Sequence, residues 1–427
     1  MQTMKQDWID KTYAVVFSGG GARGAYEMGV WKALNELGIT IEAVAGTSIG
    51  SINGALMVQK DFVRALNVWN ELSPEMVFDT DLSGIEKYRD VSNIKKLLEE
   101  NIDEKKIRDS DLRYALVTYN LSDLNDETVF IEQIQDGKLI DYLMASANHP
   151  IFKRYKIDGK LYIDGGVYNN LPAKPLVEAG YKNLIVVDVR DPLAMTSQKF
   201  DKEGTFLLEI KPKNNLGGVM NFSKESIQEN LTYGYYDTFK LFGKYLGTEY
   251  YLTSDESELS EFQFSSSDFR YLREDDFFSK LFKNRRVMLE LFRYINEMVR
   301  SRNYMSIFGK DFYIACIEIC ADTLGINRCA EYSVPELCEI LLREFEDIIQ
   351  KEKYLEENIK NRISEKLMNK NFSLENEDKK LVLAAMLGSI GMISNHYGLL
   401  ARISPKVIIS YLTANIMLNR LDFRQSD

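Results

Sequence analysis

Residues 19–24 read GGGARG and residues 46–50 read GTSIG, and these two glycine-rich segments decide the fold. Each follows an apolar run typical of a buried strand, at residues 13–17 and 41–45. The residues between them, 25–37, have the apolar spacing of a helix. A strand, a crossover helix and a parallel strand form a right-handed unit, so both loops should emerge at the same edge of a sheet. Backbone N–H groups would then lie beside a serine on a sharp turn, which is the arrangement that an oxyanion hole and its nucleophile need.

The GTSIG segment has the pattern of a nucleophile elbow in which Ser48 is the nucleophile. The pattern G-x-S-x-G is common on its own, but here it ends a predicted strand and opens a predicted helix at residues 51–58. Gly46 and Gly50 flank the serine, and small residues allow such a turn to approach its neighbours closely. The context therefore favours Ser48 as a reactive serine.

The GGGARG segment also fits the dinucleotide-binding fingerprint, because Gly19, Gly21 and Gly24 have the spacing G-x-G-x-x-G. That fingerprint requires an acidic residue at the end of the second strand, where it holds a ribose. The second strand of this chain carries Glu42 at its start and ends in the serine turn. The context therefore disfavours nucleotide binding.

A serine nucleophile needs a base, and the chain has only two histidines, His149 and His396. His396 lies in a helical pattern near the C-terminus and is expected to be structural or exposed. His149 follows an amphipathic segment and is one candidate. Asp164 is the other, because it ends a short strand and the two glycines after it, Gly165 and Gly166, would let it enter a crowded site. An Asp-Gly pair is also a common β-turn, so spacing alone leaves the choice of base open.

Taken together, these blocks resemble the patatin-like phospholipase family of lipid acyl hydrolases. The matching segments are GGGARGAY at residues 19–26, GTSIGSING at residues 46–54 and DGGV at residues 164–167, with Asn170 and Pro172 after it. A weaker match is formed by residues 145–147, Pro150 and Phe152. The resemblance covers about the first half of the chain, and several ordered blocks are more specific than any single motif.

This resemblance implies a three-layer α/β/α hydrolase with a mostly parallel central sheet, in which Ser48 is the nucleophile and Asp164 its base. The implied oxyanion hole is built from the backbone of four loop residues, Gly19, Gly20, Gly21 and Ala22. The implied activity is that of a phospholipase A or lysophospholipase, which cleaves carboxylic esters of lipids without a metal or another cofactor. The chain departs from the family at Lys153 and Arg154, two basic residues at positions where prolines are frequent in the family.

Two alternatives to this mechanism remain open from the sequence. The first is an esterase with a Ser–His–Asp triad that uses His149, and the second is a catalytically silent module that binds lipid or a protein partner. Arg23 also has two interpretations, because an arginine here could hold a lipid phosphate or lock the glycine loop through an internal ion pair.

The 427 residues favour two domains. The α/β pattern continues through expected strands at residues 183–189 and 205–210, a helix at 223–241 and a last strand at 250–252. We therefore expect a hydrolase domain at residues 1–252, a Ser- and acid-rich linker at 253–268 and an all-helical domain at 269–427.

Helical spacing supports the C-terminal assignment at residues 277–298. Ser333 and Glu336 form a capping-box pattern, and Ser404-Pro405 marks the start of the last helix. The helical domain is expected either to cap the hydrolase or to regulate it, contact a membrane, bind a protein partner or mediate self-association.

The 64 acidic and 53 basic residues give a net charge of −11, which opposes a general attraction to anionic membranes. Nothing in the sequence supports nucleic acid as a partner. The most apolar run, residues 381–393, is too short to span a bilayer, and residues 1–10 lack the apolar core of a secretory signal. We therefore expect a cytoplasmic protein that contacts the inner membrane face peripherally to reach a phospholipid substrate. Local basic groups could assist that contact, either near the site (Lys153 and Arg154) or on the helical domain (Lys283, Arg285 and Arg286).

All four cysteines lie in the expected helical domain. Cys316 and Cys320 share a helix face, but there is no C-x-x-C motif and no neighbouring histidine to complete a zinc site. Reduced thiols without a metal are therefore expected.

Overall fold

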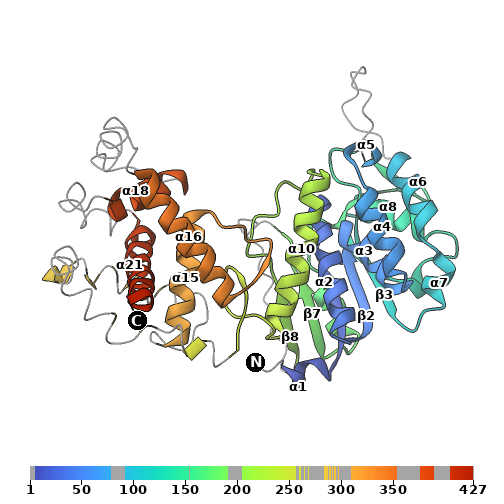
Figure 1. Ribbon diagram of the computed structural model, residues 1–427. Coiled ribbons are helices and arrows are strands. Elements are labelled where there is room, and N and C mark those ends of the chain that lie inside the picture. Colours follow the sequence, from blue (N-terminus) through green and yellow to red (C-terminus); the bar gives the residue numbers. More distant parts are fainter. Residues whose placement is uncertain are drawn as a thin grey trace, which may run out of the picture. The chain divides into compact units, whose positions relative to one another are not determined.

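The computed structural model describes residues 5–77, 92–152, 154–190, 204–255, 309–352, 376–388 and 404–426, with single residues between 259 and 297 (Figure 1). The chain divides into an N-terminal unit, Thr3–Lys244, and a C-terminal unit that begins at Tyr245. Lys153 and His396, which the sequence singled out, lie outside the described residues, as does much of the helix expected at residues 277–298.

An eight-stranded, mostly parallel sheet forms the centre of the N-terminal unit, with the strand order β5-β6-β3-β2-β1-β7-β8. The strand β4 pairs with β3 outside this path. The strands are β1 (Thr12–Phe17), β2 (Thr40–Thr47), β3 (Arg113–Asn120), β4 (Asn125–Phe130), β5 (Tyr155–Ile157), β6 (Lys160–Asp164), β7 (Asn183–Val187) and β8 (Phe206–Ile210). The five central strands are parallel to one another, whereas β4 and β6 are antiparallel to β3.

Helices cover both faces of this sheet because successive residues of each strand point to opposite sides. On one face, Ala43 and Ala45 of β2 pack in a cluster with Leu176 of the helix α9 (Ala173–Glu178). On the other face, Val44 contacts α3 (Ile49–Val58) at Gly54, where an added Cβ would lie 3.1 Å from the Val44 side chain. The three-layer α/β/α architecture expected from the sequence is therefore present.

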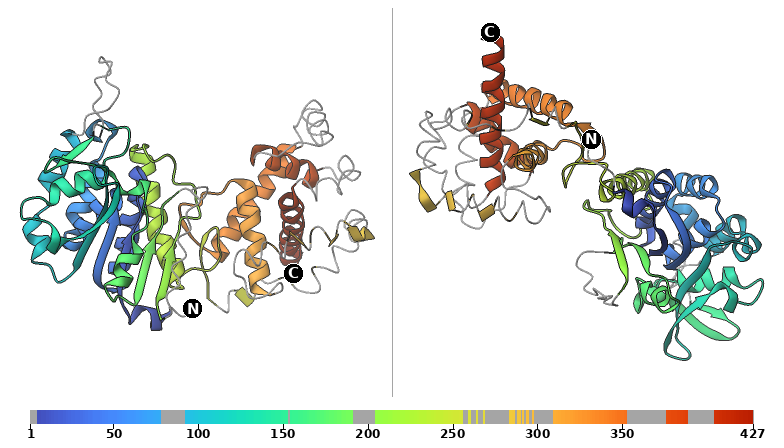
Figure 2. Two further views of the ribbon diagram at one scale, coloured as in Figure 1. Left: turned by 180° about the vertical axis from the view of Figure 1, so that it is seen from behind. Right: turned by 90° about the horizontal axis from the view of Figure 1, so that it is seen from below.

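The outer helices of that second face are α2 (Ala25–Glu36) and α10 (Lys224–Leu241), which run side by side (Figure 1; Figure 2). They cross at Gly29 and Gly234, where a Cβ on either glycine would collide with a main-chain carbonyl of the other helix. Beside this crossing the Tyr26 hydroxyl donates to Asp237 Oδ2 at 2.8 Å inside the protein. The remaining helical segments are α1 (Gln6–Ile9), α4 (Phe62–Glu71), α5 (Pro74–Val77), α6 (Ser92–Asn101), α7 (Glu104–Arg108), α8 (Leu139–Ser146), η1 (Gly21–Gly24), η2 (Ile131–Gln133) and η3 (Gly165–Val167).

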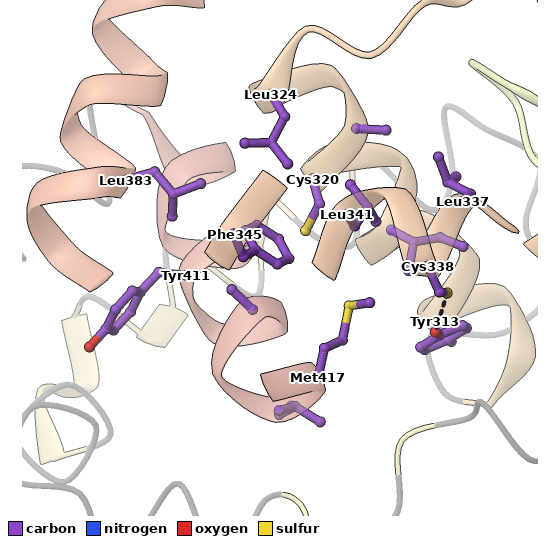
Figure 3. Packing of buried hydrophobic residues seen from close by; sticks show 14 of the residues in the cluster. Tyr313, Cys320, Leu324, Leu337, Cys338, Leu341, Phe345, Leu383, Tyr411 and Met417 are labelled. Atoms are coloured by element: carbon purple, nitrogen blue, oxygen red, sulfur yellow. Dashed lines mark hydrogen bonds between the residues drawn. The ribbon is translucent and has the colours of Figure 1, made fainter. Parts of the chain in front are cut away.

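The C-terminal unit is largely helical, and its described helices contribute to a large apolar cluster, part of which is drawn in Figure 3. Its described helices are α15 (Lys310–Leu324), α16 (Val334–Glu352), α18 (Asn376–Gly388) and α21 (Pro405–Ser426). Phe345, Leu383 and Tyr411, which are buried side chains from α16, α18 and α21, belong to this cluster. The predicted capping box is present, since Ser333 Oγ accepts from the Glu336 N–H at 3.1 Å and Glu336 Oε2 accepts from the Ser333 N–H at 3.3 Å.

The strand expected at residues 250–252 forms as β9 (Tyr251–Thr253), but it does not extend the large sheet. It pairs in parallel with β10 (Glu331–Ser333) of the C-terminal unit. The division between the units consequently falls after Lys244, earlier than residue 252, and the second unit contains a two-stranded sheet as well as helices. The residues of a short strand do not indicate which other strand it will pair with, so the sequence could not show that β9 pairs with β10.

The four cysteines are free thiols, and three of them, Cys316, Cys320 and Cys338, are buried. Cys338 Sγ lies 2.9 Å from the hydroxyl oxygen of Tyr313 (Figure 3). Within the described residues, His, Cys, Asp and Glu side chains form no cluster of three suited to a metal ion. The described helices also include none with the length and apolar character needed to cross a bilayer.

Candidate active site

Ser48 lies on the sharp turn between β2 and α3, where it has a φ of 55° and a ψ of −126°. A positive φ is strained for a serine, and this strain exposes the side chain at the edge of the sheet. A Cβ at Gly46 would collide with the backbone of Gly50, and one at Gly50 would lie 2.6 Å from the carbonyl oxygens of Phe17 and Ser18. The glycines that flank the serine are therefore required by close packing, and the segment has the geometry of a nucleophile elbow.

Asp164 accepts a hydrogen bond from Ser48 Oγ, with an O···O distance of 2.7 Å. The carboxyl group ends β6, and its other oxygen accepts from the Gly166 N–H at 2.7 Å. Gly165 approaches β3 so closely that a Cβ would lie 2.5 Å from the carbonyl oxygen of Val117. The two glycines after Asp164 thus allow the close approach and the backbone hydrogen bond that position its carboxyl group.

Burial raises the pKa of Asp164 to about 6, although the hydrogen bonds from Ser48 and Gly166 act in the opposite direction. Only 6% of the residue is exposed. A carboxylate with a pKa near 6 is a better proton acceptor than one with the ordinary value near 4.

The glycine loop between β1 and α2 lies directly against the serine, since a Cβ on Gly19 would be 3.1 Å from Ser48 Cβ. Two of its N–H groups are already used. Gly19 N–H donates to Asn170 Oδ1 at 2.7 Å, and Ala22 N–H donates to the carbonyl of Val219 at 2.8 Å.

The N–H groups of Gly20 and Gly21 make no hydrogen bond to any residue that the structure describes. Gly21 has a φ of +57°, and a Cβ there would collide with the Val219 carbonyl, so the loop requires glycine at this position. The structure therefore distinguishes two candidate oxyanion donors, Gly20 and Gly21, within the four-residue segment.

Arg23 follows this loop and donates from Nε to the carbonyl of Gly217 at 2.8 Å. Its Nη1 lies 3.5 Å from the carbonyl of Val189. These contacts connect the glycine loop to two other segments of the sheet edge through main-chain carbonyls.

His149 also lines the cavity at Ser48. Its Nδ1 accepts from the Ile151 N–H at 3.4 Å, and burial lowers the pKa of the imidazole. Among the hydrogen bonds of the described residues, none joins His149 to Ser48 or Asp164. The structure thus places Asp164, and not His149, in contact with the serine.

Sequence reasoning missed three further polar residues, two of which contact these groups while the third lines the cavity. Ser146 Oγ accepts from the Ser48 N–H at 3.0 Å and donates to the Val117 carbonyl at 2.6 Å. Asn170 holds Gly19, and Arg190 lines the cavity. Ser146 and Asn170 lie in the motifs quoted above, but sequence spacing could not show their contacts. For Arg190, the signal was a charged pair, Asp188 and Arg190, just after a buried central strand.

The cavity has a volume of about 600 Å³ and is lined mainly by apolar side chains. Its polar part contains the dyad, the glycine loop, Arg23 and Arg190. Its apolar part is formed by α3, α4, α5, α6 and the residue after α4, which contribute Ile52, Leu56, Val68, Trp69, Leu72, Val77, Ile94, Leu97 and Leu98. A volume and lining of this kind suit a small, largely apolar ligand with one reactive polar group.

A buried polar network connects the apolar wall with the glycine loop. The Trp69 indole N–H donates to Asn53 Oδ1 at 2.9 Å, and Asn53 Nδ2 donates to the Gly24 carbonyl at 3.0 Å and to Glu27 Oε2 at 2.8 Å. Burial raises the pKa of Glu27 well above its ordinary value. The network holds α2, α3 and α4 in register behind the nucleophile.

Residues 15–177 match the family model of patatin-like phospholipases, and this segment includes both Ser48 and Asp164. This match confirms the resemblance for that part of the chain. The chain is similar to patatin-like phospholipase domain-containing protein 7 of Rattus norvegicus, with 31% identity over 240 residues, 52% of this chain and 17% of that protein. It is also similar to patatin-like phospholipase domain-containing protein 6 of Homo sapiens, with 34% identity over 190 residues, 42% of this chain and 13% of that protein.

The chain thus spans less than a fifth of the length of these relatives, and the likeness is to their patatin-like phospholipase domain. A solved structure, that of VipD from Legionella pneumophila, aligns with 95% of this chain and 91% of its own at 12% identity and a TM-score of 0.39.

Proposed function

We propose that the patatin-like domain is a serine lipid acyl hydrolase that cleaves carboxylic ester bonds of phospholipids or lysophospholipids. The observation that carries this proposal is the hydrogen bond of 2.7 Å between Ser48 Oγ and Asp164 Oδ2 beside a large apolar cavity. The family match supports the lipid ester as the substrate class. The apolar part of the cavity would hold the acyl chain.

In the first step, Ser48 Oγ attacks the ester carbonyl carbon and Asp164 takes the hydroxyl proton. The N–H groups of Gly20 and Gly21 would donate to the oxyanion, and a donor of this kind typically contributes about 10²–10³-fold to the rate. Gly19 and Ala22 would hold the loop in place, because their N–H groups bind Asn170 and Val219. The N-terminus of α3 lies at Ser48, and its dipole favours negative charge there.

The tetrahedral intermediate then collapses, the C–O bond to the alcohol breaks and Asp164 returns its proton to the leaving oxygen. In the second step, Asp164 takes a proton from a water molecule that attacks the acyl-serine, and the fatty acid leaves as Ser48 Oγ regains a proton. These two reaction steps require no metal or other cofactor.

In this proposal the protein works in the cytoplasm and contacts the inner membrane face only peripherally. The helical C-terminal unit would serve regulation, binding of a protein partner or self-association.

The pH dependence of kcat/KM is expected to report Asp164. Because only the ionised carboxylate accepts a proton, kcat/KM should fall below pH 6, reach about a tenth of its plateau at pH 5 and stay level above pH 7. A pH series with a soluble short-chain ester measures this profile. His149→Ala should retain the same acidic limb, and its disappearance in that variant would assign the limb to the histidine.

The direct test of the proposed function is release of free fatty acid from mixed phospholipid vesicles, with the lyso product identified by mass spectrometry. Wild type and His149→Ala should release fatty acid at rates within about twofold of each other, since His149 has no described contact with the dyad. A fluorophosphonate should label the wild type once, at Ser48. If His149→Ala abolished release, a Ser–His–Asp triad would replace the dyad. If neither fatty acid release nor labelling occurred, the catalytically silent alternative would be favoured.

A further inference from the structure

Arg190 lies at the carboxyl edge of the sheet, just after β7, and its side chain is 11% exposed where it lines the cavity. Asp188 holds it with two hydrogen bonds, from Nε to Oδ1 at 2.8 Å and from Nη2 to Oδ2 at 2.7 Å. Asp188 Oδ1 also accepts from the Arg190 N–H at 3.1 Å. A bidentate pair of this kind fixes the plane of the guanidinium group in advance of any ligand.

The same part of the cavity contains the glycine loop and Arg23. A Cβ at Gly20 would lie 2.5 Å from the side chain of Val189, the residue before Arg190. Arg23 Nη1 lies 3.5 Å from the carbonyl oxygen of that same valine. Both guanidinium groups therefore border the segment that contains the candidate oxyanion donors.

The charges around this corner favour an anion. Burial opposes ionisation of Asp188, but the Arg190 guanidinium holds the pKa of this carboxyl below its ordinary value. The nearby carboxyl of Glu27 has its pKa raised well above the ordinary value by burial, with the charge of Asp188 acting in the same direction. Burial thus disfavours a charge on Glu27, whereas the ion pair with Arg190 favours one on Asp188.

Two other charged residues of the described part of the chain, Lys211 and Glu209, act on the Asp188–Arg190 pair. Lys211 forms an ion pair with Glu209. Asp164 is a carboxyl group of the same cavity, but its bonds are to Ser48 and Gly166, and it is the proton acceptor of the dyad. Among the described residues, Arg23 and Arg190 both line the cavity beside the glycine loop, and guanidinium groups are well suited to bind phosphate oxygens.

We propose that Arg190, oriented by Asp188, binds the phosphate of the lipid head group while the ester lies at Ser48. The domain therefore selects lipid esters that contain a phosphate over uncharged esters with the same acyl chain. This inference rests on the proposed function for the placement of the ester, but it concerns the head group and is tested without turnover.

The test compares the binding of two ether lipids with the same alkyl chain, an alkyl-glycerophosphocholine and an alkylglycerol, both below their micellar concentrations. Neither has an ester bond, so binding does not depend on catalysis. Wild type should bind the phosphate-containing lipid more tightly. Arg190→Gln should weaken that binding by about 10- to 100-fold, the usual effect of losing a hydrogen bond to a charged group, and change alkylglycerol binding by less than twofold.

Two further variants keep the result interpretable. Arg190→Lys retains the charge but not the bidentate fork, so its loss of affinity for the phosphate-containing lipid should be intermediate. This variant tests the proposal even if Arg190→Gln fails to fold. Lys174→Gln removes an exposed cation of α9 that does not line the cavity, and both lipids should bind it as they bind the wild type.

The proposal is overturned if wild type binds the two lipids equally. It is also overturned if Arg190→Gln and Arg190→Lys weaken the binding of both lipids by the same factor, or leave the binding of both unchanged. Inorganic phosphate alone should bind far more weakly than the phosphate-containing lipid, and equal binding would indicate a site for free phosphate instead of a head group. Absence of ester hydrolysis together with the expected ether-lipid preference would reject the proposed function and leave the phosphate site standing.

Discussion

Asp164→Asn and Ser48→Ala are each expected to lower kcat by about 10⁴-fold or more, the size of effect seen when a serine hydrolase loses its nucleophile or an acidic triad member. Asparagine has nearly the shape of aspartate, so the hydrogen bond from the Gly166 N–H can remain. Its amide nitrogen would donate to Ser48 Oγ and could not take the serine proton. The measurement is turnover of a soluble ester under saturating conditions, with fluorophosphonate labelling as a second readout.

The same Asp164→Asn substitution is expected to stabilise the protein at neutral pH. Since burial raises the pKa of Asp164 to about 6, the folded state disfavours the ionised carboxylate by roughly 3 kcal/mol. The sign follows from proton binding: between pH 4 and pH 6 the folded state holds a proton that the unfolded state releases, so stability decreases as the pH rises through this range. The free energy of unfolding of the variant should exceed that of the wild type above pH 6 and approach it below pH 4.

Asp158→Asn is the matched control for both measurements. Asp158 lies in the turn between β5 and β6, has a φ of 50° and a side chain that is 71% exposed. Asparagine tolerates that conformation, so activity should stay within about twofold of the wild type. If Asp164→Asn retained more than a hundredth of wild-type activity, Asp164 would not be the base.

Glu318→Ala is expected to destabilise the C-terminal unit by about 3–5 kcal/mol, because it leaves one buried and three partly buried donors without their acceptor. Glu318 is fully buried, and its Oε1 accepts from the N–H groups of Thr248, Glu249 and Tyr250 at 2.7, 2.9 and 2.9 Å. Its Oε2 accepts from the Thr248 hydroxyl at 3.1 Å. The carboxylate therefore holds residues 248–250, near the start of the unit, against α15.

Denaturant unfolding with two probes can measure this effect. All three tryptophans, Trp8, Trp31 and Trp69, lie in the N-terminal unit, so their fluorescence follows that unit alone, whereas circular dichroism follows the helices of both. Glu318→Ala should shift the part of the dichroism transition that belongs to the C-terminal unit and leave the fluorescence transition in place.

Glu318→Gln retains an acceptor oxygen and should lose less stability than Glu318→Ala. Glu339→Ala, which removes an exposed carboxylate on α16, should cost less than about 1 kcal/mol. An equal shift for Glu318→Ala and Glu339→Ala would show that the buried hydrogen bonds contribute nothing particular.

The part of the site that contains the glycine loop and Ser48 could be predicted from the sequence, because the residues that determine it are close together in the chain. The apolar runs before the two glycine-rich loops, the helix between them and the fixed handedness of the crossover together predict β1, α2, β2 and the elbow at Ser48. The capping box at Ser333 is equally local and is present. In each case the residues that interact are close in the chain, or are joined by one connection of known geometry.

The choice of base depended on contacts between distant segments. Spacing did not separate His149 from Asp164, and only the resemblance to a family favoured the aspartate. In the structure, β6 pairs antiparallel with β3, and this pairing brings Asp164 to Ser48 across 116 residues of sequence. Nothing in the DGG segment itself indicates which strand it will pair with.

The sequence by itself therefore determined the α/β architecture, the sharp turn at Ser48 and the glycine loop, since these follow from periodicity and short connections. Only the tertiary structure decided that the Gly19 N–H binds Asn170, that Asp188 orients Arg190 toward the cavity and that β9 belongs to the C-terminal unit. The physical reason is common to all three. Hydrogen bonds and strand pairing join groups that are far apart in the chain, and their partners are set by packing of the whole unit.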